Sequence, residues 1–404
     1  MESPKIRFKG YTEDWEERKL DDVARFSKGN GYSKGDLVEE GTPIILYGRL
    51  YTNYETTINV VDTFVDEKEN SVFSKGGEVV VPASGETSED IARASAIENA
   101  GILLGGDLNV ISPNESINSS FLALSISYGN AKKELAKKAQ GKSVVHIHNT
   151  EIKGLSIPFP SKREQEKIAI YFTYLDNLIN LHQRKCEETK KIKKYMLQKM
   201  FPQNGKNIPE IRFEGFTGAW EQRKLGEVFE QTTNFVNLDE GKMELWSLTV
   251  EDGLTPKSER YNREFLVKKD TNFKEVRPGD IVYNPMNMTL GAVGYNGMAK
   301  SVAVSGYYTT MVANAGYDSY CINTWLKSPY AISLYKTFAT GSLKEKQRVQ
   351  FPTLSIIPTV FPESEEQKKI GLFFERLDNL ITLHQRKCDE LKTLKKYMLQ
   401  NMFV

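Results

Sequence analysis

The chain repeats itself at an offset of 202 residues, and this duplication constrains the fold more than any other feature of the sequence. Residues 175–201 and 377–403 are identical at 21 of 27 positions. The segments from Pro4 to Leu20 and from Pro209 to Leu225 are identical at 11 of 17 positions, at an offset of 205. The stretches between these flanks, about 21–157 and 226–357, share little visible similarity. We therefore expect one fold present twice, with repeated flanks and divergent domains.

Fainter echoes of the repeat lie inside the divergent stretches. Residues 77–81 (GEVVV) and 279–283 (GDIVY) match at the offset of 202, and each predicts a turn that leads into a buried strand. Gly141 and Gly341 each lie 17 residues before a proline. The divergent stretches are therefore expected to share a fold despite their differences.

Composition excludes several protein classes. A length of 404 residues, with 39% hydrophobic and 26% charged residues, is typical of a soluble protein of two to four domains, and an odd number of cysteines fits reduced thiols in the cytoplasm. The N-terminus lacks a signal-peptide pattern, no apolar run approaches a membrane span, and the three cysteines form no CxxC pair. The net charge of +1 says nothing about nucleic acid, so only the distribution of charge is informative.

The repeated segments carry a helical period. Apolar residues recur every three or four positions after Pro160 and Ser161, and Pro202 ends the run. This predicts two helices of nearly 40 residues, whose narrow stripes are typical of a coiled coil. Because the chain must return from one helix to the other, we expect them to pack antiparallel. The expected seam comprises Leu175, Leu178, His182, Cys186, Ile192, Met196, Leu377, Leu380, His384, Cys388, Leu394 and Met398.

The divergent stretches predict mixed α+β domains of about 140 residues each. Residues 42–47, 78–81, 281–283 and 301–305 resemble strands. Residues 121–139 and 323–338 resemble helices.

Several short motifs suggest chemistry, but each is incomplete. Residues 136–143 end in Gly-Lys-Ser, yet a P-loop needs glycine where Ala136 stands. Asn284-Pro285-Met286-Asn287 lacks the second proline and the aromatic residue of an adenine methyltransferase loop, and Glu151-Ile152-Lys153 lacks the aspartate of a nuclease motif. His146 and His148 alternate with apolar residues, which favours a polar or ligand-facing strand surface over a metal pair. The histidines and cysteines of the helices are expected to pack in the seam, so no metal site is predicted.

Basic residues are clustered although the total charge is balanced. Residues 182–201 carry seven lysines and arginines against two acids. Lysines also gather between Lys132 and Lys142, and Lys344, Lys346 and Arg348 occupy the corresponding part of the second half. Basic and amide side chains after Gly141 and Gly341 suit contacts to phosphates and base edges.

The arrangement of domain, helix, domain, helix resembles the specificity subunits of type I restriction-modification systems over the whole chain. The resemblance includes Pro158, Glu164-Gln165, Ile168 and Leu175-Asp176, and again Pro358, Glu366-Gln367, Ile370 and Leu377-Asp378. It implies a target recognition domain over residues 1–160, a spacer helix over 161–203, a second recognition domain over 204–361 and a second spacer helix over 362–404.

The resemblance also implies a function without catalysis by this chain. Each recognition domain would read one half of an asymmetric, bipartite site in double-stranded DNA, and the coiled coil would set the gap. Two modification subunits would bring S-adenosylmethionine and methylate adenine, and two restriction subunits would bring ATP and magnesium. No cofactor is expected on this chain and no membrane contact.

Candidate DNA contacts follow from loops expected to leave strands. Arg49 and Arg348 suit guanine, and the asparagines suit adenine. The candidate residues are Tyr47, Arg49, Ser84, Thr87, Gln140, Lys142, Trp246, Asn284, Asn287, Lys344, Gln347 and Arg348.

Two other functions remain open at this point. A non-catalytic coiled-coil scaffold would explain duplicated helices but not the divergence of the domains between them. A specificity module of a related methyltransferase without a restriction subunit would share every feature above. A stand-alone methyltransferase or nuclease would need cofactor or metal motifs that the sequence does not display.

Overall fold

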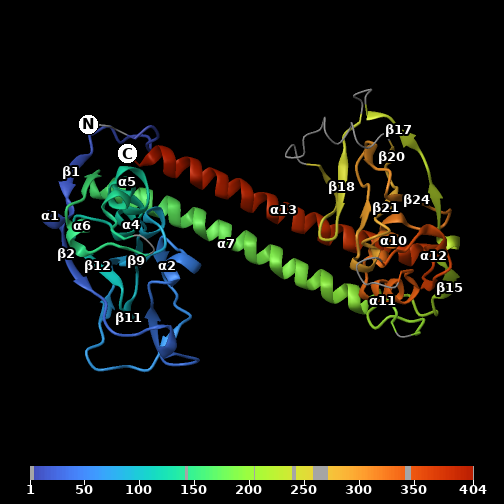
Figure 1. The fold of residues 1–404 in the computed structure, drawn as a ribbon, viewed down its shortest axis with the longest axis horizontal. Coiled ribbons are helices and arrows are strands. Elements are labelled where there is room, and N and C mark those ends of the chain that lie inside the picture. The colour runs from blue at the N-terminus through green and yellow to red at the C-terminus, as the bar shows by residue number, and fades with distance from the viewer. Residues whose placement is uncertain are drawn as a thin grey trace. The chain divides into compact units, whose positions relative to one another are not determined.

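The computed structural model describes residues 4–141, 144–203, 205–238, 243–257, 272–341 and 347–403. The chain forms two compact units, each built from two separate segments. Unit 1 comprises residues 1–183 and 386–404, and unit 2 comprises residues 184–385. Each unit therefore combines one divergent domain with parts of both long helices, α7 (Lys162–Lys199) and α13 (Ser364–Met402) (Figure 1).

Unit 1 is a mixed α+β unit with two five-stranded sheets. The first sheet has the order β2-β12-β8-β10-β5 and the second the order β3-β6-β4-β11-β7. The first sheet contains β2 (Ala24–Lys28), β12 (Leu108–Pro113), β8 (Glu78–Pro82), β10 (Ser95–Ile97) and β5 (Thr57–Ile58). The second contains β3 (Leu37–Val38), β6 (Phe64–Val65), β4 (Thr42–Ile45), β11 (Ala100–Leu104) and β7 (Phe73–Lys75). The helices are α1 (Leu20–Val23), η1 (Lys34–Asp36), α2 (Arg49–Thr52), α3 (Ser88–Ile91), α4 (Ser119–Ser127), α5 (Gly129–Lys138) and α6 (Asn149–Lys153).

Unit 2 repeats the first sheet of unit 1 and replaces the second. Its four-stranded sheet has the order β16-β24-β21-β22, which corresponds to β2-β12-β8-β10. These strands are β16 (Phe229–Thr232), β24 (Thr309–Ala313), β21 (Ile281–Tyr283) and β22 (Val293–Tyr295). The remaining sheets pair β17 (Phe235–Val236), β20 (Phe273–Val276) and β23 (Val302–Ser305), and separately β18 (Trp246–Thr249) with β19 (Gly253–Pro256). The helices are α8 (Leu225–Val228), η3 (Met288–Leu290), α10 (Ser319–Leu326), α11 (Pro329–Phe338) and α12 (Phe351–Ser355).

The repeated flanks close each domain with a two-stranded sheet. In unit 1, β1 (Glu16–Lys19) pairs antiparallel with β14 (Ser156–Phe159). In unit 2, β15 (Glu221–Lys224) pairs with β25 (Pro358–Phe361) in the same way. The two ends of each divergent stretch are thus held together at the point where the long helix begins.

Buried ion pairs join the opening segments to the long helices. Arg7 donates two hydrogen bonds to the fully buried Glu164, at 2.7 and 2.8 Å. Arg212 donates two to the fully buried Glu366, both at 2.7 Å. A buried carboxylate needs such a partner, because an uncompensated buried charge is costly. The repeated arginine and the repeated Glu-Gln pair are therefore two parts of one contact.

The two long helices pack antiparallel, as the sequence predicts. In unit 1, Asp176 of α7 forms an ion pair with Lys395 of α13. In unit 2, Lys193 of α7 forms the equivalent ion pair with Asp378. Each pair joins an early position of one helix to a late position of the other. The predicted fold class, two mixed α/β domains with an antiparallel helix pair and an internal repeat, is confirmed.

The seam follows a strict seven-residue repeat with lysine at one of its positions. Every seventh residue of α7 from position 172 faces the seam, together with the residue three places further on. These residues are Phe172, Leu175, Ile179, His182, Cys186, Thr189, Lys193, Met196 and Met200, and each is buried or partly buried. The repeat is typical of a coiled coil, and the equivalent positions of α13 follow it too.

Three predicted seam residues lie at the surface instead. Ile192, Leu380 and Leu394 are 50%, 43% and 41% exposed. Ile192 and Leu394 each precede a lysine that occupies the seam, Lys193 and Lys395. Ile192 and Leu394 were predicted to face the seam. The ion pairs of the following lysines with aspartate place the lysines in the seam instead.

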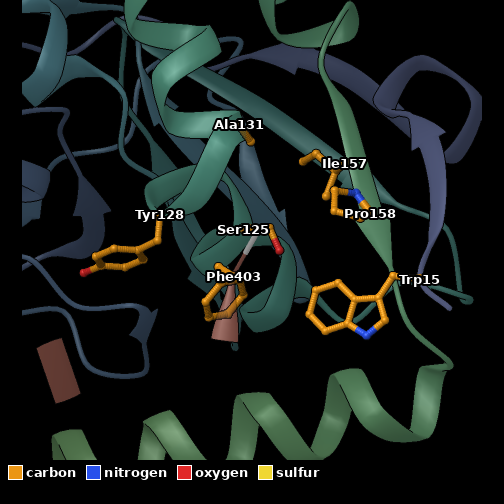
Figure 2. A pocket seen from close by; sticks show the side chains of 7 residues that line it. All are labelled: Trp15, Ser125, Tyr128, Ala131, Ile157, Pro158 and Phe403. Carbon is orange, nitrogen blue, oxygen red and sulfur yellow. The ribbon is translucent and has the colours of Figure 1, made fainter. Parts of the chain in front are cut away.

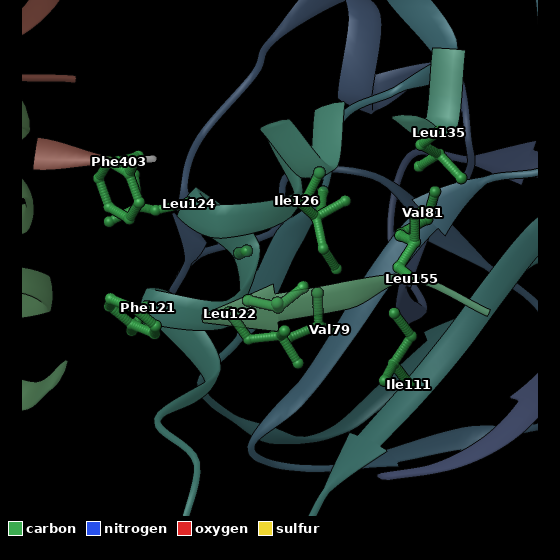
Figure 3. Packing of buried hydrophobic residues seen from close by; sticks show 14 of the residues in the cluster. Val79, Val81, Ile111, Phe121, Leu122, Leu124, Ile126, Leu135, Leu155 and Phe403 are labelled. Atoms are coloured by element: carbon green, nitrogen blue, oxygen red, sulfur yellow. The ribbon is translucent and has the colours of Figure 1, made fainter. Parts of the chain in front are cut away.

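The end of α13 completes the core of unit 1. Phe403 contacts Phe121 of α4, with ring centroids 5.8 Å apart (Figure 3). It also contacts Phe172 of α7, with ring centroids 5.9 Å apart. In unit 2, Phe201 at the end of α7 contacts Phe374 of α13 at 6.0 Å. Phe201 and Phe403 are repeat equivalents, as are Phe172 and Phe374. The same aromatic contact therefore forms in both units.

Trp15 and Trp220 are repeat equivalents with different partners. Trp220 Nε1 donates to Glu366 at 3.1 Å. Trp15 Nε1 is buried without a hydrogen-bond partner among the described residues. Trp15 lines a small cavity with Ser125, Tyr128 and Phe403 (Figure 2). The cavity belongs to the core of unit 1, because mainly apolar side chains surround it.

Most predicted elements of the domains are present. The strand predictions at 42–47, 78–81, 281–283 and 301–305 correspond to β4, β8, β21 and β23. The helix predicted over 121–139 is two helices, because the chain turns at Tyr128, which has extended backbone angles, before Gly129, whose φ is +70°. The helix predicted over 323–338 is likewise divided between α10 and α11, with Pro329 at the start of α11.

Candidate nucleic-acid interface

In unit 1, the structure brings together two loops that carry predicted site residues. After β8, residues Ser84–Gly85 form β9, which pairs antiparallel with β13 (Val145–His146). Ile147 N donates to Ala83 O at 3.0 Å. Gln140 and His146 exchange two backbone hydrogen bonds, at 3.1 and 2.8 Å. Ser84 and Gln140, which are far apart in the sequence, therefore lie on neighbouring segments.

Unit 2 contains the same arrangement. Val349 N donates to Pro285 O at 3.0 Å, directly after β21. Thr340 and Arg348 exchange two backbone hydrogen bonds, at 3.0 and 2.9 Å. We call these segments the paired loops: residues 83–87 with 140–141 and 144–148 in unit 1, and residues 284–287 with 340–341 and 347–349 in unit 2.

The paired loops correspond at an offset of 202 at Ala83, His146 and Ile147, and at an offset of 200 at Gln140 and Gly141. Ala83 corresponds to Pro285 and Ile147 to Val349, and each correspondence is marked by the same backbone hydrogen bond. His146 therefore corresponds to Arg348. The described backbone contacts of this region recur in both units, whereas the side chains that it presents are different.

A glycine with a positive φ lies at the start of each second loop. Gly141 has a φ of +138° and Gly341 a φ of +117°, which are left-handed values that favour glycine. A Cβ atom added to Gly141 would lie 1.9 Å from Val144 O. Any side chain at position 141 would therefore displace the loop that carries His146.

His146 presents an exposed side chain from the paired loops of unit 1. Its Nδ1 atom lies 3.2 Å from the hydroxyl of Ser84, which is 8% exposed. The rings of His146 and His148 are stacked, with centroids 6.5 Å apart. The prediction of a polar strand surface around the two histidines agrees with this geometry.

The short helix α2 lies beside the same loops. The Tyr51 hydroxyl donates to Ser84 O at 2.8 Å, and burial raises the pKa of Tyr51, so the phenol stays neutral. Arg93 stacks on the Tyr51 ring at 5.0 Å. Tyr47 contacts Tyr51 edge to face at 6.4 Å and is 38% exposed. Of the residues predicted from α2, Tyr47 is therefore near the paired loops and accessible.

Arg49 makes contacts within the protein. Its guanidinium group pairs with Glu55 at 2.9 Å and with Asp62 at 2.5 Å, and donates to Val60 O at 3.0 Å. The side chain is only 10% exposed. A contact from Arg49 to guanine stays a prediction, and it would require these two ion pairs to open.

Thr87 has a structural role that the sequence did not suggest. It is the N-cap of α3, where its hydroxyl accepts a hydrogen bond from Asp90 N at 3.1 Å. The same hydroxyl donates to the Asp90 carboxylate at 2.8 Å. Capping accounts for a threonine at this position without a contact to DNA.

In unit 2, the predicted asparagines lie in the paired loops. Asn284 directly follows β21, and its side chain accepts a hydrogen bond from Met286 N at 3.0 Å. Asn287 is exposed and precedes η3. Gln347 and Arg348 lie on the facing segment, and Arg348 is exposed. Four predicted residues are thus on one pair of loops.

The other predicted residues are placed differently. Trp246, in β18, donates to Glu244 at 3.2 Å and packs against a small core around Val276 and Val302. Among the described residues, these contacts place Trp246 with that core rather than with the paired loops. Lys142 and Lys344 lie outside the described residues, so their predicted roles stay predictions.

Neither a candidate metal cluster nor a candidate membrane span occurs among the described residues. No group of three or more histidine, cysteine, aspartate or glutamate side chains is arranged to hold a metal ion in this part of the chain. In the same ranges, no helix has the length and apolar composition that a membrane span requires. Cys186 lies in the helix seam, where its thiol is 3.9 Å from Ile381 O.

Sequence reasoning missed His146 as a candidate contact. The signal was present, because His146 lies 202 residues before Arg348, which was predicted. The loop of unit 2 is two residues longer between its bridging residues, Thr340 and Arg348, than the loop between Gln140 and His146. This difference hides the correspondence when positions are counted from the glycines.

Comparison with known proteins identifies one family. The family model described as the type I restriction modification DNA specificity domain matches residues 12–191 and again residues 218–393. The type I restriction enzyme MjaVIII specificity subunit of Methanocaldococcus jannaschii is 22% identical over 402 residues, which cover 95% of this chain and 91% of that protein. A second specificity subunit described for the same organism, MjaX, is 23% identical over 415 residues, covering 95% and 91%.

A solved structure shares the fold. The crystal structure of the type I restriction-modification system S subunit from M. genitalium matches with a TM-score of 0.65 at 15% identity. The match covers 100% of this chain and 99% of that one. At this identity the similarity concerns the fold alone.

Proposed function

Because this chain belongs to the family of type I restriction-modification DNA specificity subunits, we propose that each unit reads one half of an asymmetric, bipartite DNA site through its paired loops. The chain is the specificity subunit of a type I restriction-modification complex, so it contributes the choice of sequence and not the catalysis. One observation supports the proposal most: a backbone repeated at an offset of 202 presents different side chains in the two units.

The chemistry of the paired loops suits DNA recognition. Exposed histidine, arginine and asparagine side chains carry the hydrogen-bonding groups that distinguish bases in the major groove. Because His146 and Arg348 differ, as do Ser84 and Met286, the two half-sites should have different sequences. Helices α7 and α13 would set the number of unread base pairs between the half-sites.

The partners of the chain belong to the same proposal. Two modification subunits would supply S-adenosylmethionine and methylate adenine within the site. Two restriction subunits would supply ATP hydrolysis with magnesium and DNA cleavage. The chain itself would hold none of these cofactors.

The methylated sequence tests the proposal. The chain, coexpressed with its modification subunits in a host without adenine methylation, should produce one methylated motif with two different halves separated by several base pairs. A continuous palindrome would contradict the reading by two different units. A matched host that lacks only this chain should show no methylated motif.

Binding measurements separate DNA recognition from the alternative of a coiled-coil scaffold. The complex should bind DNA with an affinity that falls steeply as salt rises, because phosphate contacts release counterions. A scaffold would show no such dependence. If restriction subunits never copurify while methylation persists, the chain would instead be the specificity module of a methyltransferase alone.

A further inference from the structure

We propose that positions 146 and 348 are equivalent base-contacting positions, and that His146 contacts a purine in the half-site read by unit 1. This inference rests on the proposed function, which it extends to single residues. It begins from the correspondence of the two side chains. Each forms a backbone bridge to the residue before a glycine of positive φ, and each precedes a buried residue that is bonded to the end of the central strand.

The backbone at this position does not depend on the side chain. His146 is held by its two backbone hydrogen bonds to Gln140, and Arg348 by two to Thr340. The following residues, Ile147 and Val349, are fully buried and anchor the segment. A position with a fixed backbone and an exposed side chain can change its residue without unfolding the domain. A position that determines which DNA sequence is bound needs this freedom to change its residue. Histidine occupies the position in unit 1, and arginine occupies it in unit 2.

Ser84 orients the histidine. Ser84 lies in β9, the strand that pairs with β13, and its hydroxyl lies 3.2 Å from Nδ1 of His146. Tyr51 donates to Ser84 O at 2.8 Å, and Arg93 covers the Tyr51 ring, so the strand that carries Ser84 is itself held in place. With Nδ1 engaged by Ser84, Nε2 is the ring atom left for the base, and it donates to N7 or O6 of a purine when the Ser84 hydroxyl donates to Nδ1.

The neighbouring position differs between the units in a way that matches the side chains. Ser84 corresponds to Met286, which is 52% exposed. Methionine cannot orient Arg348 by a hydrogen bond, and the planar guanidinium group, with five donors, contacts guanine at two atoms without such help. The histidine, with one ring nitrogen for the base, needs the serine. Ser84 is therefore a positioning residue, and His146 is the proposed contact.

The decisive experiment compares the methylated motifs of single variants of the full chain, each coexpressed with the modification subunits. In His146→Ala, one base position in one half-site should lose discrimination by about fivefold or more, while the other half stays unchanged. Arg348→Ala should relax one position in the opposite half. Glu115→Ala is the control, because Glu115 belongs to the same unit and is exposed but lies outside the paired loops.

Several outcomes would overturn the inference without touching the proposed function. An unchanged motif in His146→Ala, with methylation retained, would show that the residue reads no base. Uniformly weaker methylation of all sequences would mark His146 as a phosphate contact. Relaxation of the same half-site by both variants would contradict their placement in separate units.

Two further variants keep the test open to failure. If His146→Ala abolishes methylation, His146→Asn should restore it with an altered base preference, and no methylation in both variants would overturn a role confined to base choice. Ser84→Ala should weaken discrimination at the same base as His146→Ala, but less. If the wild-type chain produced no bipartite motif at all, the proposed function itself would fail.

Discussion

At the scale of single residues, Glu164 and Glu366 show why the repeated flanks stay nearly identical. Each carboxylate is fully buried and accepts two hydrogen bonds from one arginine. The next residue, Gln165 or Gln367, accepts a backbone hydrogen bond from Asn118 or Asp318, the residue that caps α4 or α10. A change at either residue would disturb the helix, the opening segment and the domain together.

Glu366→Ala should lower the free energy of unfolding of unit 2 by about 3–5 kcal/mol, because it leaves Arg212 partly buried without its carboxylate. Trp220 would also lose its hydrogen bond to Glu366. Denaturant unfolding followed by tryptophan fluorescence measures the change. Glu365→Ala is the control: its ion pair with Lys368 is exposed and screened by solvent, so no measurable loss is expected. Equal effects of the two variants would contradict the role of the buried pair.

Residues of the interface were the hardest to predict from sequence. Asn284, Gln347 and Arg348 were chosen because they lie near expected strand ends, and the structure places them on the paired loops. Arg49 was predicted on the same grounds, but its guanidinium group forms ion pairs with Glu55 and Asp62. No sequence pattern signals those ion pairs, because they depend on how a loop folds back. His146 was missed because its correspondence to Arg348 requires the backbone bridge to be seen.

At the scale of elements, the long helices could be predicted almost completely from the sequence. Their period, start and end were visible, since Ser161 precedes the first residue of α7 and Pro202 follows its end. Not every seam residue could be identified from the sequence. A lysine in the seam is stable only opposite an aspartate, and the register that brings Lys193 to Asp378 belongs to the packed pair.

These ion pairs should fix the register of the helices. Lys193→Asp and Asp378→Lys each place like charges together, and each should destabilise unit 2 by about 1–2 kcal/mol. The double variant should recover at least half of the loss. Full recovery is not expected, because the Tyr320 hydroxyl donates to Asp378 at 2.7 Å. A thermodynamic cycle from denaturant unfolding gives the coupling.

The exposed pair of Arg386 and Glu390 provides the comparison for that cycle. These residues lie four positions apart on α13, 3.6 Å from each other. Because both side chains are exposed, their exchange should show a much weaker coupling than the exchange of Lys193 and Asp378. A coupling for Lys193 and Asp378 no larger than this would mean that the seam pair does not specify the register.

At the scale of the whole molecule, each unit is completed by a helix end from the other half of the sequence. Phe403 fills the core of unit 1, and its repeat equivalent Phe201 fills that of unit 2. Lys395 and Lys193 pair with equivalent aspartates. The divergent domains were the part whose topology the sequence did not reveal, because their sheets depend on pairings between distant short strands.

A fragment of residues 1–203 should therefore form a dimer, since α7 of a second copy can supply Lys193 and Phe201 where α13 supplies Lys395 and Phe403. Light scattering after size-exclusion chromatography should give twice the mass of the fragment. With modification subunits, the methylated motif should be symmetric and contain the unit 1 half-site twice. Phe201→Asp should reduce dimer formation; a folded monomer of the unaltered fragment would contradict the equivalence.

The hydrogen bond between each opening segment and a helix end bears on how genes of this family can be rearranged. Ile6 N donates to Asn401 O at 3.0 Å in unit 1, and the equivalent Ile211 N donates to Lys199 O at 3.0 Å in unit 2. In unit 2 a short covalent connection joins the helix end to the next opening segment, whereas in unit 1 the same junction forms without one. The order of the two recognition domains along the gene should therefore not affect which DNA sequence the protein recognises. Two genes with their halves exchanged would encode proteins that recognise the same DNA sequence.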